Sequence, residues 1–212
     1  MFGSPKRTGR FMGLLSRRSG RAVLICLFLA FLAVGLTILG ILRGYGGGSV
    51  QTERVIVIAV DTLRADHVSG LGYRRSTTPV LDEFGKKEAS VFANAYASSS
   101  WTLPSSVSLM TGLHPHQHGV EDRGQKLHPD VPTLAGAFSR AGFKSAAFVT
   151  HIYVSSLFGI DSGFDEFHEL SINWEFKEGK QLRAEELNDA VFPWLENHSQ
   201  ERFFLYLHYF DP

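Results

Sequence analysis

The spacing of hydrophobic and polar residues changes along this chain, and it predicts three strands. Residues 55–60 form an unbroken apolar, β-branched run, which is typical of a strand buried on both faces of a sheet. Residues 143–149 and 203–207 are predicted as two further strands. These three runs are the buried strands of the predicted fold.

Helical patterns separate the strands, at residues 78–87, 131–141 and 183–196. A further apolar stretch at 107–110 is predicted to be helical and to end at Gly112. In 183–196 the apolar residues recur every three or four positions on one face, and Pro193 is expected to kink or shorten that helix. Strands that alternate with helices predict an α/β sandwich around a mostly parallel central sheet.

A different pattern precedes the first strand. Residues 22–42 are uncharged and apolar, and a helix of that length spans roughly 30 Å, the thickness of a bilayer's hydrocarbon core. Basic residues cluster before this run, and no acidic residue occurs before Glu53. The positive-inside rule therefore predicts a single-pass signal-anchor helix with a cytoplasmic N-terminus. A cleaved signal peptide is the alternative, but the run is long for one and no small-x-small site follows Leu42.

These patterns divide the chain into a basic cytoplasmic tail (1–21), a transmembrane helix (22–42), a linker (43–53) and a domain placed in the periplasm or outside the cell (54–212). The formal net charge is +0, and the basic residues gather before the membrane span rather than on the domain. This distribution argues against a nucleic-acid partner. Cys26 is the only cysteine, so neither an internal disulfide nor a cysteine metal cluster is possible.

Polar residues follow two of the predicted strands. Asp61 comes directly after the first, and His208 and Asp211 lie at the end of the third. Because ligands of open parallel sheets collect at the carboxyl ends of the strands, these residues are candidates for a site. The structural alternative is that Asp61 merely caps the turn after its strand.

A hydroxyl residue begins the helical stretch that ends at Gly112. Thr102 is predicted as its N-cap, and Pro104 fits the first turn. The positive end of a helix favours a bound sulfate or phosphate, and it also favours the alkoxide form of an attacking hydroxyl. The alternative is an ordinary threonine cap.

Three histidines alternate with other residues shortly after this helix. His114, His116 and His118 have a spacing that can bind a metal ion, although surface and supporting roles are the commoner use of such residues. Both interpretations stay open at this point.

Together, these features and others in the same order resemble the sulfatase family of the alkaline-phosphatase-like superfamily. The segments that carry the resemblance are 57–67 (VIAVDTLRADH), 77–82 (TTPVLD), 102–105 (TLPS), 109–112 (LMTG), 115–120 (PHQHGV), 130–135 (DVPTLA), 141–143 (AGF), 163–166 (GFDE) and 203–212 (FFLYLHYFDP). The resemblance covers 54–212 and implies the N-terminal part of an alkaline-phosphatase-like sandwich with an incomplete central sheet.

The resemblance implies roles for particular residues. Asp61 takes the place of the first carboxylate ligand of a divalent cation (calcium, magnesium, manganese or zinc), and Thr62 stands where many members have a second Asp. Thr102 occupies the position of the nucleophile and would also contact the metal. His151 and His208 are candidate substrate-binding residues, His151 in partial replacement of a Lys-Trp-His pattern that this chain lacks.

Two departures from the family pattern change the chemistry that the resemblance implies. Ordinary sulfatases have Cys or Ser converted to formylglycine at the nucleophile position, and Thr102 cannot be converted in that way. In the related phosphoglycerol and phosphoethanolamine transferases, threonine itself attacks. The motif's arginine is replaced by Ser106. The later metal ligands and the family's catalytic histidine would lie beyond Pro212, so a fragment that is inactive alone is expected.

The sequence therefore predicts a membrane-anchored, metal-dependent hydrolase of extracytoplasmic sulfate or phosphate esters carried by a glycan, a lipid or a small molecule. A transferase of phosphoryl-linked head groups is the first alternative, which Thr102 and the membrane helix favour. A non-catalytic or truncated sulfatase-like protein is the second, which Thr62 and Ser106 favour.

Overall fold

The computed structural model describes residues 54–170 and 182–210. The predicted tail, membrane helix and linker lie outside this part of the chain, as does Asp211. Among the described helices, none has the length and apolar character that crossing a bilayer requires.

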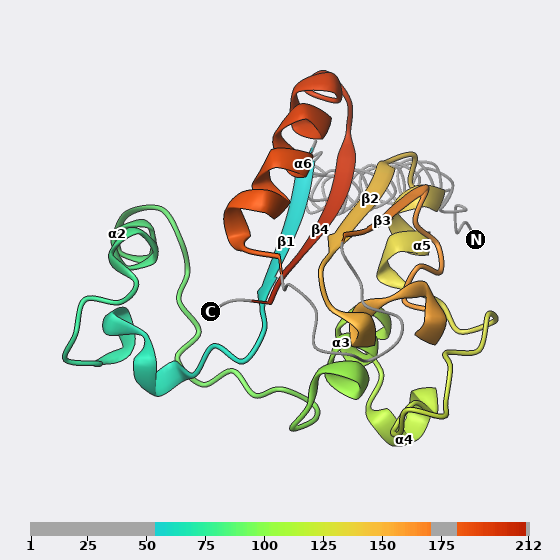
Figure 1. Ribbon diagram of the computed structural model, residues 1–212, viewed down its shortest axis with the longest axis horizontal. Helices are drawn as coiled ribbons and strands as arrows, with labels where there is room; N and C mark the ends of the chain where they lie inside the picture. The colour runs from blue at the N-terminus through green and yellow to red at the C-terminus, as the bar shows by residue number, and fades with distance from the viewer. Residues whose placement is uncertain (1–53, 171–181, 211–212) are drawn as a thin grey trace, which may run out of the picture. The chain divides into compact units, whose positions relative to one another are not determined.

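A parallel sheet of four strands lies at the centre of the described residues (Figure 1). Its order is β1 (Arg54–Val60), β4 (Phe203–Tyr209), β2 (Lys144–Val149) and β3 (Glu166–Glu169), and each neighbouring pair is parallel. The three predicted strands and the parallel α/β architecture are confirmed, but the expectation that β1 is buried on both faces is wrong. Within the described residues β1 is an edge strand, and its Ile56 and Ile58 are 46% and 60% exposed. The sequence analysis missed β3, because its residues EFHE contain no apolar run.

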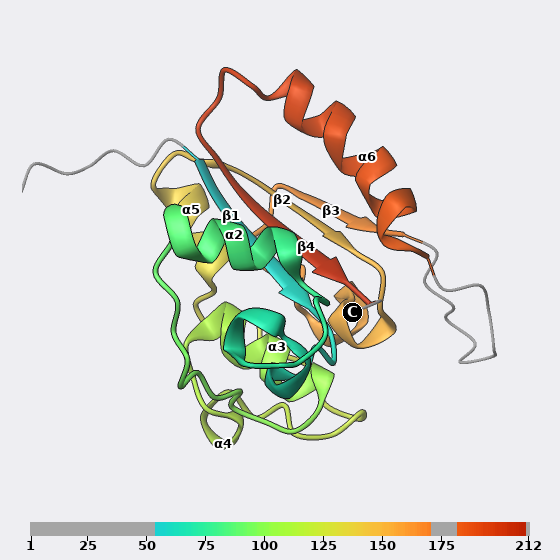
Figure 2. The same ribbon diagram turned by 90° about the vertical axis from the view of Figure 1, so that its left-hand side faces the viewer.

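The side chains of β4 alternate between two hydrophobic cores, as the two-residue period of a strand requires. Phe204 and Tyr206 pack in one core with residues of α3 (Thr102–Thr111) and α5 (Leu134–Arg140). Phe203, Leu205 and Leu207 point to the opposite face and pack in the other core with α6 (Ala184–Asn197). Figure 2 shows α6 on one side of the sheet and α3 and α5 on the other.

Helix α6 runs through Pro193 and ends at Asn197, so the expected shortening did not occur. Its buried residues Leu187, Val191 and Trp194 pack on the sheet. Burying three large side chains stabilises the helix by several kcal/mol, about 1.5–3 kcal/mol each, which offsets the roughly 3 kcal/mol cost of an interior proline.

The other predicted helices are also present, with shifted ends. Helix α2 (Pro79–Lys87) begins one residue later than expected, and α5 begins at Leu134 because the hydroxyl of Thr133 caps it by accepting a hydrogen bond from Gly136 N. The remaining helical segments are α4 (Pro115–His118) and the short 3-10 helices Ala65–His67, Ser69–Leu71, Ile152–Val154 and Ser156–Phe158.

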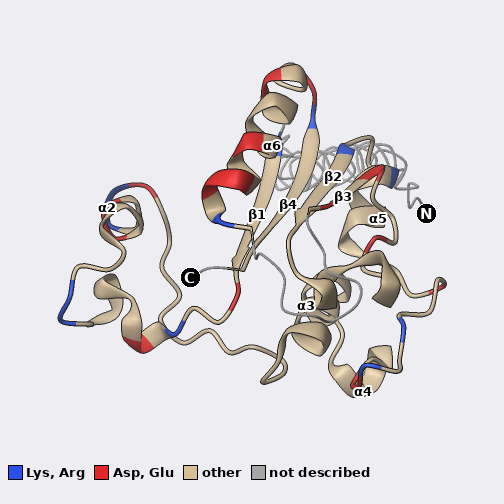
Figure 3. Cartoon of the chain, viewed as in Figure 1, with Lys and Arg blue, Asp and Glu red and all other residues tan. Residues whose placement is uncertain are grey.

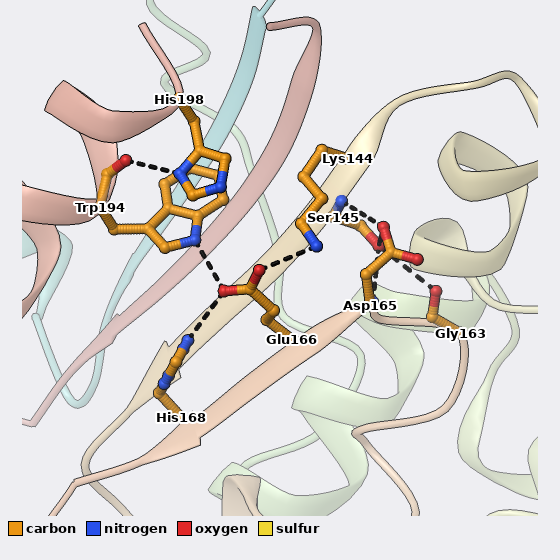
Figure 4. A network of polar contacts seen from close by, with 8 residues as sticks. All are labelled: Lys144, Ser145, Gly163, Asp165, Glu166, His168, Trp194 and His198. Atoms are coloured by element: carbon orange, nitrogen blue, oxygen red, sulfur yellow. Dashed lines mark hydrogen bonds and ion pairs between the residues drawn. The ribbon is translucent and has the colours of Figure 1, made fainter.

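A polar cluster joins α6 to the edge of the sheet at the start of β3 (Figure 4). Glu166 pairs with Lys144 Nζ at 2.8 Å and accepts a hydrogen bond from Trp194 Nε1 at 2.9 Å. His168 Nε2 lies 3.3 Å from the same carboxylate, and the ring of His198 stacks on Trp194 with centroids 4.1 Å apart. This cluster lies at the amino ends of β2 and β3. It therefore leaves the carboxyl ends of the strands free for a site.

Candidate functional site

The carboxyl end of β1 places Asp61 beside the neighbouring strand. Its backbone N–H donates to Tyr209 O at 2.8 Å, which continues the β1–β4 ladder by one residue. Thr62 then has φ of 55°, in the left-handed region that a β-branched residue rarely adopts. Such a conformation costs on the order of 1–3 kcal/mol and tends to occur at functional sites.

Helix α3 brings the hydroxyl of Thr102 to Asp61, although the two residues are 41 positions apart in sequence. Thr102 Oγ1 donates to Asp61 Oδ2 at 3.1 Å, with Oδ1 at 3.3 Å. The N-cap of α3 is Trp101, and Thr102 is its first helical residue, so the prediction of Thr102 as N-cap was wrong. Because the hydroxyl does not cap its own helix, it is free to face the carboxylate.

Helix α3 also gives this place a positive electrostatic potential. The first backbone N–H groups of an α-helix have no acceptor within the helix, and the aligned peptide dipoles add a partial positive charge there. An anionic ester group near Thr102 would meet both effects.

Two histidines border the Asp61 carboxylate. His208 Nε2 lies 3.6 Å from Asp61 Oδ2, and the two side chains are 3% and 10% exposed. Burial lowers the pKa of His208 to about 4, against the opposing effect of Asp61. At neutral pH the His208 imidazole in this contact is therefore neutral. The Nδ1 atom of His208 is buried and has no hydrogen-bond partner among the described residues.

His151 is the second of these histidines and follows β2. Its ring centroid lies 6.3 Å from that of His208, and its ring stacks on Phe210 at 4.6 Å. Burial lowers the pKa of His151, and Asp61 opposes that shift. The four candidate residues therefore lie together at the carboxyl ends of the strands. Asp61 follows β1, His151 follows β2, His208 lies near the end of β4, and Thr102 begins α3.

A cavity of about 350 Å³ opens at this edge. Its polar lining consists of Asp61, Thr62, Ser99, Ser100, Thr102, Ser105, Ser106, Tyr206 and His208, with Trp101 among the apolar lining residues. The sequence analysis missed Tyr206 as a site residue. The signal was available, because Tyr206 precedes His208 by two residues on the same strand and so shares its face.

Ser106 and Tyr206 face each other where the family pattern would place an arginine. Burial raises the pKa of the Tyr206 phenol, and the Ser106 hydroxyl opposes this shift. Their contact lacks normal hydrogen-bond geometry, which leaves the Tyr206 hydroxyl without a partner in the described residues. Ser106 and Tyr206 therefore contribute neutral hydroxyl groups to the lining, and no guanidinium is among the residues that line the cavity.

The three alternating histidines do not form a metal site in the described part of the chain, where no group of three or more His, Cys, Asp or Glu side chains converges. His118 is buried and structural: its Nδ1 accepts from Val120 N at 3.1 Å, and its Nε2 lies 3.1 Å from Ser108 Oγ on α3. His114 and His116 stack on each other at 5.9 Å.

The donor atoms near Asp61 fit part of a site for a divalent cation. A carboxylate and a hydroxyl are oxygen ligands of the kind that magnesium, calcium and manganese prefer, and His208 Nε2, which lies 3.6 Å from Asp61 Oδ2, would suit zinc. Six or more ligands surround such hard cations, so Asp61 and Thr102 alone do not complete the set.

The comparisons with known proteins agree with this arrangement. The Sulfatase family model matches residues 53–212. A Δ4,5-hexuronate-2-O-sulfatase of Bacteroides thetaiotaomicron is 28% identical over 112 residues, which cover 50% of this chain and 23% of the relative. The chain spans 20% to 27% of the length of the curated relatives it matches.

Solved structures share the fold. A protein in complex with its substrate D-glucosamine-2-N,6-O-disulfate superposes with a TM-score of 0.59 at 21% identity, covering 73% of this chain and 33% of that one. The lipoteichoic acid synthase of Listeria monocytogenes superposes with a TM-score of 0.56 at 21% identity, covering 76% of this chain and 41% of that one. At these identities the likeness concerns the fold alone. With a family model that matches most of its length, and a carboxylate and a hydroxyl brought together at the carboxyl edge of a parallel sheet, this chain belongs to the sulfatase family.

Proposed function

We propose that this chain carries the nucleophile of a metal-dependent hydrolase that cleaves sulfate or phosphate esters, with Thr102 as the attacking residue. One observation carries the proposal: Thr102 Oγ1 lies 3.1 Å from Asp61 Oδ2, at the start of a helix and in the wall of a cavity. A threonine that served only as a cap would accept a hydrogen bond from its own helix, whereas this one donates to a carboxylate from another element.

The chemistry would proceed in two displacements. Thr102 Oγ1 attacks the sulfur or phosphorus atom in line with the leaving oxygen, the bond to that oxygen breaks, and the alcohol departs after gaining a proton. Asp61 orients the Thr102 hydroxyl and accepts its proton as general base, and the departing alcohol takes its proton from water. Water then cleaves the Thr102 ester, which releases sulfate or phosphate and restores the hydroxyl. The N–H groups at the start of α3 would stabilise the non-bridging oxygens.

A divalent cation bound by Asp61 and Thr102 would supply Lewis-acid polarisation of the ester and a lower pKa for the threonine hydroxyl. His151 and His208, which burial keeps neutral near pH 7, would contact the substrate as hydrogen-bond donors or acceptors without adding charge. Their neutrality suits a role in binding the ester.

The substrate and the location are also proposals. The relative named above is a sulfatase of a hexuronate, so a sulfated glycan is the substrate class that the comparisons support. The apolar segment at 22–42 supports a single-pass membrane anchor with the catalytic domain in the periplasm or outside the cell.

A transferase remains the second candidate, and the identity of the nucleophile favours it. Thr102 cannot become formylglycine, and a threonine ester can pass its group to an acceptor alcohol in place of water. The fold it shares with the lipoteichoic acid synthase is compatible with this chemistry. The non-catalytic alternative is supported by Ser106, which leaves the cavity without the family's arginine.

The test is turnover by the protein that the complete reading frame encodes. It would be assayed with p-nitrophenyl sulfate, phosphate monoesters and phosphodiesters, with and without added Mn²⁺ or Ca²⁺. We expect metal-dependent release of p-nitrophenol that falls at least a hundredfold in Thr102→Ala and survives in Ser105→Ala, a control in the same cavity wall. Equal turnover in Thr102→Ala would refute the proposal. An acceptor-linked product would select the transferase.

A further inference from the structure

An aromatic array continues the wall of the cavity away from Thr102. Trp101, the residue before Thr102, lines the cavity and meets the ring of Tyr153 edge-on, with centroids 5.5 Å apart. Tyr153 also contacts His151 at 5.2 Å and Phe158 at 5.8 Å. Because three neighbouring rings contact it, the position of the Tyr153 ring is well defined.

A cation lies over this ring. The guanidinium carbon of Arg123 is 5.2 Å from the centroid of Tyr153, and Arg123 itself is exposed. Figure 3 shows both acidic and basic residues in the chain beside α4, where this arginine occurs. The nearest acidic neighbour in sequence, Asp122, accepts a hydrogen bond from the backbone N–H of Arg123 at 2.6 Å. No carboxylate pairs with the guanidinium within residues 54–170 and 182–210.

The chemistry of this contact differs from that of an ion pair. An aromatic face attracts the guanidinium but does not neutralise its charge or occupy its N–H donors. Arg123 is therefore held in place with its donors available, in the planar arrangement that binds carboxylate, sulfate or phosphate. Tyr153 links Arg123 to the cavity, because its ring also contacts Trp101, which lines the cavity.

We propose that Arg123, positioned on Tyr153, forms a subsite that binds a second anionic group of the substrate while the reacting ester lies at Thr102. This inference rests on the proposed function and extends it: the substrate would be an ester that carries at least two anionic groups. No guanidinium lines the cavity, and Arg123 lies outside the lining, next to Tyr153, which contacts the lining residue Trp101. Arg123 would determine specificity and would take no part in the bond-breaking steps.

The test compares two sugars that differ in one anionic group. Glucosamine carrying both N- and 6-O-sulfate would be titrated against N-acetylglucosamine 6-sulfate by calorimetry, with the protein of the complete reading frame in a Thr102→Ala background that prevents turnover. We expect the disulfated sugar to bind about tenfold more tightly, which corresponds to about 1.4 kcal/mol, because its second anionic group gains a charge-assisted hydrogen bond. Arg123→Ala should abolish this preference and leave the affinity for the monosulfated sugar unchanged.

Two further variants make the result specific. Arg75→Ala, which removes an exposed arginine on another loop, should keep the tenfold preference. Tyr153→Leu should weaken it, because the guanidinium would lose the ring that positions it. An unchanged preference in Arg123→Ala, or no preference in the parent, would overturn the subsite. If neither sugar binds but the unsubstituted protein hydrolyses p-nitrophenyl sulfate, only the subsite is refuted. If neither sugar binds and p-nitrophenyl sulfate is not hydrolysed, the proposed function fails as well.

Discussion

Gly163 allows a quantitative prediction about a turn that the sequence marked only as part of a motif. Its φ is +87°, and a Cβ built there would lie 2.5 Å from Gly136 N, 2.7 Å from Gly136 Cα and 2.7 Å from Thr133 Oγ1. The first two atoms belong to the backbone of α5 and cannot move without shifting the helix. The third is the hydroxyl that caps α5 and donates to Ser162 O at 2.8 Å.

The cost of Gly163→Ala follows from three effects. A left-handed conformation costs about 1–2 kcal/mol for a residue with a Cβ, displacement of packed backbone costs about 1–3 kcal/mol, and loss of a threonine cap costs about 1 kcal/mol. The free energy of unfolding should therefore fall by about 3–6 kcal/mol. Gly142→Ala is the matched control, because Gly142 has φ of +80° and no heavy atom within 4 Å of its Cβ position.

Urea denaturation followed by tryptophan fluorescence would measure both variants. Gly142→Ala should lose only the conformational cost of about 1–2 kcal/mol, so the difference between the two variants isolates the close approach of Gly163 to α5. Equal destabilisation of the two variants would show that backbone conformation alone explains the glycine, and it would refute the packing argument.

Two other predictions concern charge and strain. The Lys144 ammonium and Trp194 N–H lower the pKa of Glu166 from 4.5 to about 2, so its contribution to stability is complete above pH 4.5 and is lost as the pH falls towards 2. Glu166→Gln should remove about 1 kcal/mol of this pH-dependent stability, allowing for solvent screening. Thr62→Asn should raise the free energy of unfolding by about 1 kcal/mol, since asparagine tolerates φ of 55°; an unchanged or lower value would show that Thr62 is not strained.

The sequence predicted the fold well where the hydrophobic period was clear. β1, β2 and β4 follow from apolar runs, of which only β2 and β4 are buried, and α6 follows from its apolar face. It failed at β3, a strand of mixed polar residues whose place is determined by pairing with β2 and by the contacts of Glu166. Pairing partners are distant in sequence, so a local period cannot reveal them.

The candidate site was predicted in its composition but not in its contacts. Asp61 and His208 were expected at one edge because parallel strands share their carboxyl ends. The hydrogen bond between Thr102 and Asp61 depends on where α3 begins. The N-cap is Trp101 rather than Thr102, because the backbone of Trp101 is extended, with φ of −145°. The Arg123–Tyr153 contact joins a loop to the 3-10 helix Ile152–Val154 and could not be predicted from any local pattern.

The most direct test of the central claim is to trap the covalent intermediate. The protein of the complete reading frame would be mixed with p-nitrophenyl sulfate or p-nitrophenyl phosphate, quenched in acid at short times, and analysed by peptide mass spectrometry. The account predicts a sulfuryl or phosphoryl group on Thr102 that disappears as substrate is consumed and never forms in Thr102→Ala. Steady turnover with Thr102 unmodified at every time point, and retained in Thr102→Ala, would contradict it.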